Sequence, residues 1–240
     1  MGPTIQVKIE DYIALYEQSL PLNRIKPLNN STYRIFKESG LDIRLARRKQ
    51  TYENPLAFEK IKKFTLVNDW FYMIPVTTME ETIVGFIIRG VFRSDYNTVS
   101  REFSDLKYKL PLMFGFDKRF KKFADLDTCY PIVVCEGSKD CIFMKRFYPY
   151  TVSINTSSMG LNAYVLINLS NKFVLAYDND EAGQNGIERD KKILRNLGAQ
   201  VVSLELDRNL KDCAQYLDYP EKVPKLKEEL IYKLKRVMSF

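Results

Sequence analysis

The chain has 240 residues, 45% of them hydrophobic, and a formal net charge of +7, which allows a buried core in one domain or two. No apolar run approaches the roughly 20 residues that span a bilayer. The N-terminus also lacks the apolar core of a secretion signal, so we expect a cytoplasmic protein with no membrane partner. The sequence contains no histidine, which excludes the Ser-His and Cys-His arrangements of many hydrolases.

The chain has four cysteines: Cys129, Cys135, Cys141 and Cys213. No pair has the two-residue gap of a zinc knuckle, and no histidine can complete a mixed site. We therefore predict no zinc site. Reduced thiols with a structural role are the favoured interpretation.

The first half of the chain mixes helical and strand patterns. Pro21, Pro27 and an Asn-Asn pair end the first amphipathic helix, Ser31 is placed to cap the second, and Gly40 is placed to end it. In chain order, we predict helices over 6–20, 31–40 and 54–63 and strands over 70–76 and 82–92.

Two stretches of this half, residues 21–50 and 107–122, are rich in lysine and arginine. Such patches suit a polyanion partner, and aromatic residues lie among them. The alternative is a solvated charged face with ordinary core aromatics. The aromatic residues concerned are Tyr33, Phe36, Tyr108, Phe114, Phe116 and Phe120.

The pattern changes after residue 127 to apolar strands that alternate with helices. This alternation predicts a parallel sheet with crossover helices. We expect an α+β basic N-terminal subdomain over 1–127, an α/β domain over 128–217 and a C-terminal basic helix within 218–240. The predicted elements are strands over 131–135, 151–154, 173–177 and 200–206 and helices over 138–147, 160–169, 182–197, from about 211, and 223–237.

Three acidic residues directly follow two of these strands. Glu136 comes after the first, and Asp178 and Asp180 come after the strand over 173–177. In parallel sheets the residues just past the carboxyl ends of the strands line the ligand crevice, so these side chains should gather at one edge. Carboxylates without His or Cys among them suit a hard cation such as Mg²⁺.

This spacing resembles the TOPRIM domain, which topoisomerases, bacterial-type primases and several nucleases share. The matching residues are Glu136-Gly137 with Asp140, and then Asp178-x-Asp180-x-Ala182-Gly183. Upstream segments are similar, in order and spacing, to the basic N-terminal half of a bacterial- or phage-type primase catalytic core. These segments are Ile74-Pro75-Val76, Gly85 to Gly90, Lys107-Tyr108 and Phe114-Gly115, and the resemblance covers roughly residues 30–217.

The resemblance implies roles for particular residues. Glu136, Asp178 and Asp180 would be catalytic and would hold Mg²⁺ or Mn²⁺ together with Asp212. Fuller family members often have two aspartates where this chain has Asp212 alone, which leaves a second metal ion open. The expected nucleotide- or template-binding residues are Arg89, Lys107, Lys109 and Lys139. For Asp140, a role in the site and a simple interaction with the helix dipole are both open.

The function implied is that of a DNA primase, which synthesises short RNA primers on single-stranded DNA from NTPs by metal-dependent nucleotidyl transfer during DNA replication. One alternative is a TOPRIM nuclease, in which water replaces the 3′-hydroxyl, although no Gly-x-x-x-x-Gly-Lys loop marks the ATPase partner of known nuclease branches. A second alternative is a non-catalytic nucleic-acid-binding replication accessory. Retention of Glu136, Asp178 and Asp180 argues against that role.

Bacterial-type primases usually also carry a zinc-binding domain and a helicase or helicase-binding domain. The cysteine spacing excludes the first, and only about 20 residues follow the TOPRIM pattern. We therefore expect a nearly bare catalytic core in a bacterial cell or a phage-infected host. Its expected partners are the single-stranded template, NTPs, a replicative helicase and a separate template-reading or zinc-bearing subunit.

Overall fold

A computed structural model describes residues 9–25, 31–47, 50, 69–91, 96–100, 113–121, 130–156 and 158–239. The chain divides into two compact units, which we call the N-terminal unit (Met1–Thr78 and Thr82–Leu112) and the C-terminal unit (Met79–Glu81 and Met113–Phe240). This division lies before the expected boundary near residue 127, because Met113 and Phe120 are buried in the core of the C-terminal unit. The C-terminal helix is also part of that unit.

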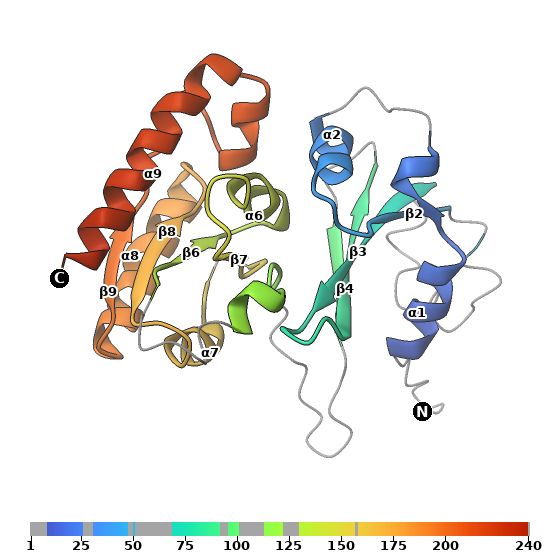
Figure 1. Ribbon diagram of the computed structural model, residues 1–240, viewed down its shortest axis with the longest axis horizontal. Coiled ribbons are helices and arrows are strands. Elements are labelled where there is room, and N and C mark those ends of the chain that lie inside the picture. The colour runs from blue at the N-terminus through green and yellow to red at the C-terminus, as the bar shows by residue number, and fades with distance from the viewer. Residues whose placement is uncertain are drawn as a thin grey trace. The chain divides into compact units, whose positions relative to one another are not determined.

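The N-terminal unit is built on a five-stranded sheet in the order β1-β2-β3-β4-β5, of which β2, β3 and β4 are labelled in Figure 1. Every neighbouring pair of strands is antiparallel. Its elements are α1 (Ile9–Glu17), β1 (Leu20–Pro21), the 3₁₀ helix η1 (Leu22–Arg24), α2 (Ser31–Glu38), β2 (Arg44–Arg47), β3 (Trp70–Thr77), β4 (Ile83–Gly90) and β5 (Tyr96–Ser100).

Helix α1 packs its apolar stripe against this sheet. Tyr12 and Leu15 are buried beside Phe71 and Phe86 of the two central strands. The predicted helices over 6–20 and 31–40 and the predicted strands over 70–76 and 82–92 correspond to α1, α2, β3 and β4. The short strands β1, β2 and β5 were not predicted. The predicted helix over 54–63 lies outside the described residues.

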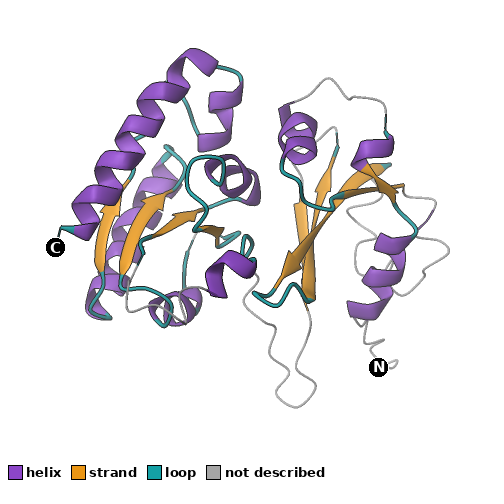
Figure 2. Cartoon of the chain, in the orientation of Figure 1, coloured by secondary structure: helices purple, strands orange, loops and turns teal. Residues whose placement is uncertain are grey.

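The C-terminal unit contains a four-stranded parallel sheet in the order β7-β6-β8-β9, whose strands are labelled in Figure 1. Figure 2 shows the helices that surround these strands. Its strands are β6 (Ile132–Cys135), β7 (Thr151–Ser153), β8 (Lys172–Ala176) and β9 (Gln200–Ser203). Its helices are η2 (Lys118–Lys121), α6 (Ser138–Met144), α7 (Asn162–Ile167), α8 (Glu181–Asn196), η3 (Cys213–Leu217), η4 (Pro220–Lys222) and α9 (Val223–Met238). The expected α/β architecture is confirmed.

Helices cover both faces of the parallel sheet. Leu166 of α7 and Leu194 of α8 share a core with Ile132 and Val134 of β6. Helix α6 contacts β6 and β7, and α9 contacts β8 and β9. All four residues of β6 are buried, which explains why this strand is a continuous apolar run rather than an alternating one.

The aromatic residues within the basic stretches mostly belong to the cores. Tyr33, Phe36, Phe114 and Phe120 are buried, which supports the core interpretation for these four; Tyr108 lies outside the described residues. Cys135, Cys141 and Cys213 are free thiols buried in the C-terminal unit, as expected, and Cys129 lies outside the described residues. Within the described part of the chain, no helix combines the length and apolar character of a membrane span.

Candidate metal centre at the carboxyl edge of the parallel sheet

The two central strands of the C-terminal unit bring Glu136 and Asp178 to the same edge. Cys135, the last residue of β6, pairs with Ala176, the last residue of β8. Glu136 therefore leaves the sheet beside Tyr177, one residue before Asp178. Because the strands are parallel, their carboxyl ends meet at one edge, as the sequence pattern implied.

The turn between β8 and α8 depends on Gly183. A Cβ atom at this position would lie 2.0 Å from the carbonyl oxygen of Asp178, so only glycine fits without moving the turn. Asp180 caps α8, since its Oδ1 accepts a hydrogen bond of 2.9 Å from the backbone NH of Gly183. The first turn of the helix thus fixes Asp180 close to Asp178.

The electrostatics of Glu136 and Asp178 are those of crowded carboxylates. Burial, followed by the charges of Asp178 and Asp180, raises the pKa of Glu136 above its ordinary value. Burial and the charge of Asp212 raise the pKa of Asp178. The Oε2 atom of Glu136 is buried and has no hydrogen-bond partner among the described residues. A buried oxygen without a partner, on a carboxylate repelled by its neighbours, favours a bound cation.

Asp180 and Asp212 are held differently, because each caps a helix and meets a lysine. The Oδ2 atom of Asp180 lies 3.1 Å from Lys211 Nζ, and the pKa of Asp180 is lowered by the Gly183 NH and then by Lys211. Asp212 caps η3 by accepting 2.8 Å from the backbone NH of Gln215. Its Oδ2 lies 3.7 Å from Lys139 Nζ.

Asp140 is the most buried carboxylate of this edge. It lies in the first turn of α6, where its Oδ1 accepts 2.9 Å from the backbone NH of Ala214. Burial, followed by the charge of Asp212, raises the pKa of Asp140 to about 7. Asp140 therefore links α6 to η3, the helix that Asp212 caps.

Several contributing residues were not singled out from the sequence. Lys211 lies 3.7 Å from Asp178 Oδ2 as well as 3.1 Å from Asp180. The backbone NH of Asn179 donates 2.6 Å to the Lys211 carbonyl, and the backbone NH of Asn155 donates 2.9 Å to the Glu136 carbonyl. Asn179 and Lys211 both come after strands at the carboxyl edge, and this position in the sequence was the signal that could have predicted their contribution to the site.

The predicted nucleotide- and template-binding residues are distributed over the chain. Lys139 lies on α6 beside Asp212, within the C-terminal unit. Arg89 lies half-buried on β4 of the N-terminal unit, where its backbone belongs to the sheet and its side chain forms no hydrogen bond or ion pair with another described residue. Lys107 and Lys109 lie outside the described residues.

The carboxylates fit a divalent ion by their chemistry. Their donor atoms are all oxygens, which Mg²⁺ and Mn²⁺ prefer, and Glu136 offers an unpartnered buried oxygen. Over the described residues, however, no three acidic, cysteine or histidine side chains converge closely enough to hold an ion on their own. An ion at this edge would therefore need further ligands, such as water or substrate oxygens.

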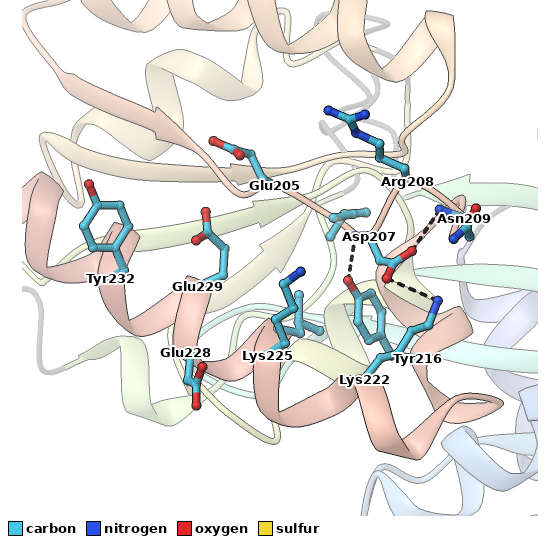
Figure 3. Close-up of a pocket in the computed structure, with 12 residues that line it drawn as sticks. Glu205, Asp207, Arg208, Asn209, Tyr216, Lys222, Lys225, Glu228, Glu229 and Tyr232 are labelled. Carbon is cyan, nitrogen blue, oxygen red and sulfur yellow. Dashed lines mark hydrogen bonds and ion pairs between the residues drawn. The ribbon is translucent and has the colours of Figure 1, made fainter.

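A groove of about 650 Å³ lies next to the segment that follows β9 (Figure 3). Asp207 forms its wall, with Tyr216 Oη accepting 2.8 Å from the Asp207 NH and Lys222 Nζ 3.1 Å from Asp207 Oδ2. The side-chain amide of Asn179 donates to the Asp207 carbonyl at 3.3 Å. The wall of the groove thus braces the turn that carries Asp178 and Asp180.

A Toprim-like family model matches residues 133–217. An Aquifex aeolicus primase structure with zinc-binding and RNA polymerase domains is 16% identical with a TM-score of 0.63, over 94% of this chain and 60% of that one. A DnaG primase catalytic domain bound to single-stranded DNA is 16% identical with a TM-score of 0.58, over 92% and 83%. The primase fragment of the bacteriophage T7 primase-helicase is 16% identical with a TM-score of 0.52, over 84% and 70%.

A search of curated protein sequences found no match. The family model and the solved structures nevertheless agree on the fold. The C-terminal unit carries a Toprim-like domain, and the chain has the fold of bacterial and phage primase catalytic cores over most of its length. This chain spans three fifths of the Aquifex structure that it matches.

Proposed function

We propose that this chain is a DNA primase that synthesises short RNA primers on single-stranded DNA by divalent-metal-dependent nucleotidyl transfer during DNA replication. The observation that carries the proposal is the extent of the structural likeness. Primase cores match 92–94% of the chain, and hence both units, whereas a Toprim domain alone would match only the second. A Toprim domain by itself would leave a nuclease equally favoured.

In this proposal Glu136 and Asp178 hold the divalent ion, Mg²⁺ or Mn²⁺, at the carboxyl edge. When bound, the ion would activate the 3′-hydroxyl and neutralise charge on the reacting phosphate. Asp180 keeps the turn in place through its cap on Gly183, and Asp212 keeps Lys139 beside the same edge. Asp140 positions Asp212 through the Ala214 NH and touches no substrate.

The N-terminal unit would bind the template and the incoming nucleotide. Arg89 supports this role, because its half-buried guanidinium has no ionic partner among the described residues and phosphate oxygens are its natural partners. We assign the same role to Lys107 and Lys109. Lys139, beside Asp212, would contact nucleotide phosphates in the C-terminal unit.

The partners of the proposed primase follow from the same likeness. Single-stranded DNA is the ligand of one matching DnaG domain, and we propose it as the template here, with NTPs as substrates. We also propose a replicative helicase and a separate zinc-bearing or template-reading subunit as partners. The proposed location is the cytoplasm of a bacterial cell or a phage-infected host.

The test is a primer-synthesis assay with purified protein, single-stranded DNA, labelled NTPs and Mg²⁺ or Mn²⁺, resolved on a denaturing gel. We expect template-dependent oligoribonucleotides that disappear in Asp178→Ala. Shortened nucleic acid instead would establish the nuclease alternative. If no product forms even in the presence of a zinc-bearing partner, while DNA binding is intact, the non-catalytic accessory role is the remaining interpretation.

A further inference from the structure

The carboxylates of this edge fall into two kinds according to what their oxygens contact. Asp180 uses Oδ1 for the Gly183 NH and Oδ2 for Lys211 Nζ. Asp212 uses Oδ1 for the Gln215 NH and Oδ2 for Lys139 Nζ. Both oxygens of each aspartate are therefore engaged by groups of this chain.

Glu136 and Asp178 keep free oxygens. The Oε2 atom of Glu136 is buried without a partner among the described residues. Asp178 has one ionic contact in the described structure, from its Oδ2 to Lys211 Nζ at 3.7 Å. These two side chains, which come from adjacent strands, are thus the ones with coordination capacity left for an added cation.

The fold holds the backbone of Lys211 and the side chain of Lys139, whereas the side chain of Lys211 is 56% exposed. The Lys211 carbonyl accepts 2.6 Å from the Asn179 NH, and the Lys211 NH donates 2.7 Å to Gln215 Oε1, so its backbone is fixed on both sides. The side chain of Lys139 is only 17% exposed and that of its partner Asp212 is 16% exposed. A largely desolvated ion pair is screened less than a surface pair.

The net charge of the edge agrees with the division of the carboxylates into those paired with lysines and those with free oxygens. Outside the buried Asp140, four carboxylates and two ammonium groups face one another. When all are ionised, two negative charges remain uncompensated, which is the charge that one divalent ion offsets. A second divalent ion would leave the edge with an excess of positive charge before any substrate arrives.

We propose that the ammonium groups of Lys211 and Lys139 take the place of a second divalent ion, so that this centre binds a single ion through Glu136 and Asp178. This inference rests on the proposed function, since it concerns the ion that would serve nucleotidyl transfer. Asp180 and Asp212 then act through the lysines they hold.

The test counts bound Mn²⁺ by EPR of the free ion, with isothermal titration calorimetry alongside, on the full chain without DNA or nucleotide. Wild type should bind one ion per chain. Lys211→Met should still bind one ion, roughly tenfold tighter, because a positive charge about 4 Å from the carboxylates is removed. Lys211→Met/Lys139→Met leaves four uncompensated carboxylates, the charge that two divalent ions offset, and should bind two. Lys211→Arg keeps the charge and should still bind one.

The matched control is Lys222→Met, which removes a Lys–Asp pair of the same 3.1 Å length at the groove and should leave one ion bound. Two ions in wild type, no ion in wild type, or one ion in Lys211→Met/Lys139→Met would each overturn the inference. Because this measurement needs no polymerisation, failure of primer synthesis leaves it standing. Conversely, if the protein synthesises primers and binds two ions, only the inference that lysines replace the second ion is wrong, and the proposed function stands.

Discussion

In the N-terminal unit all five strands run antiparallel, so successive connections leave the sheet at opposite ends. In the C-terminal unit four parallel strands end at one edge. Residues that are distant in the chain, such as Glu136 and Asp212, therefore reach the same edge of the second unit.

Charged residues behave differently in the two units as a result. In the N-terminal unit, Arg44 lies over the ring of Tyr16 at 4.4 Å from its centroid, and Arg47 over that of Trp70 at 5.0 Å. These arginines use their flat faces for packing. In the C-terminal unit, burial and crowding raise the pKa values of Glu136 and Asp178. The first arrangement suits binding and the second suits chemistry.

The largest effect should come from Glu136→Gln, which removes a charge from the crowded edge. Primer synthesis should fall by roughly 10³-fold, because several kcal/mol of metal-dependent transition-state stabilisation are lost. Thermal stability should stay the same or rise, because the Oε2 atom of Glu136 has no partner among the described residues and the carboxylate is repelled by Asp178 and Asp180. Gel assays and calorimetry check the two effects together.

Glu188→Gln is the control for that variant, since Glu188 is an exposed residue of α8 that pairs with Lys191. Its synthesis should match wild type. A Glu136→Gln protein that both loses activity and melts far below wild type would show that this carboxylate stabilises the fold instead.

Gly183→Ala should damage the turn that carries Asp178. The new Cβ would lie 2.0 Å from the Asp178 carbonyl oxygen, so the turn must move, at a cost of roughly 2 to 4 kcal/mol in the free energy of unfolding. Chemical denaturation measures the loss. The control, Gly160→Ala, places a Cβ with no atom within 4 Å at a φ of +49° and should lose only about 1 kcal/mol. Equal losses in both variants would refute the close-approach argument.

Asp140→Asn should change how stability depends on pH. The pKa of Asp140 is raised from its ordinary 3.8 to about 7 in the fold, so the native state binds a proton that the unfolded chain releases. Stability should then fall as pH rises from about 4 to about 7, by on the order of 3 kcal/mol. The amide can still accept the Ala214 NH, so the variant should be less sensitive to pH across this window. Denaturation at pH 5 and pH 8 makes the comparison, and equal pH slopes would contradict it.

Arg89→Ala should have the smallest effect and should act on binding alone. We expect single-stranded DNA or NTP affinity to fall roughly three- to tenfold, and the slope of log affinity against log salt to decrease by up to about 1. Synthesis at saturating substrate should be nearly unchanged. Fluorescence anisotropy at several salt concentrations measures the affinity, with the exposed Arg195→Ala of α8 as control. If synthesis is lost at saturating substrate, Arg89 takes part in the chemical step rather than in binding alone.

The parallel sheet and its acidic edge were predictable because each central strand is a continuous apolar run ended by an acid. β2 was not, because Arg44 and Arg47 made its four residues look like part of a basic patch. Their packing partners, Tyr16 and Trp70, are distant in the chain. The position of Lys211 likewise depends on hydrogen bonds from Asn179 and Gln215, which appear only once the strands are aligned.

The most direct test of the central claim measures single-stranded DNA binding and primer synthesis on the same preparations of wild type, Asp178→Asn and Arg89→Ala. The claim is that the C-terminal unit performs the chemistry and the N-terminal unit binds template and nucleotide. Asp178→Asn should therefore bind DNA within about twofold of wild type and lose synthesis by roughly 10³-fold. Arg89→Ala should show weaker binding with synthesis restored at high substrate. Synthesis by Asp178→Asn at more than about a tenth of the wild-type rate would contradict the account.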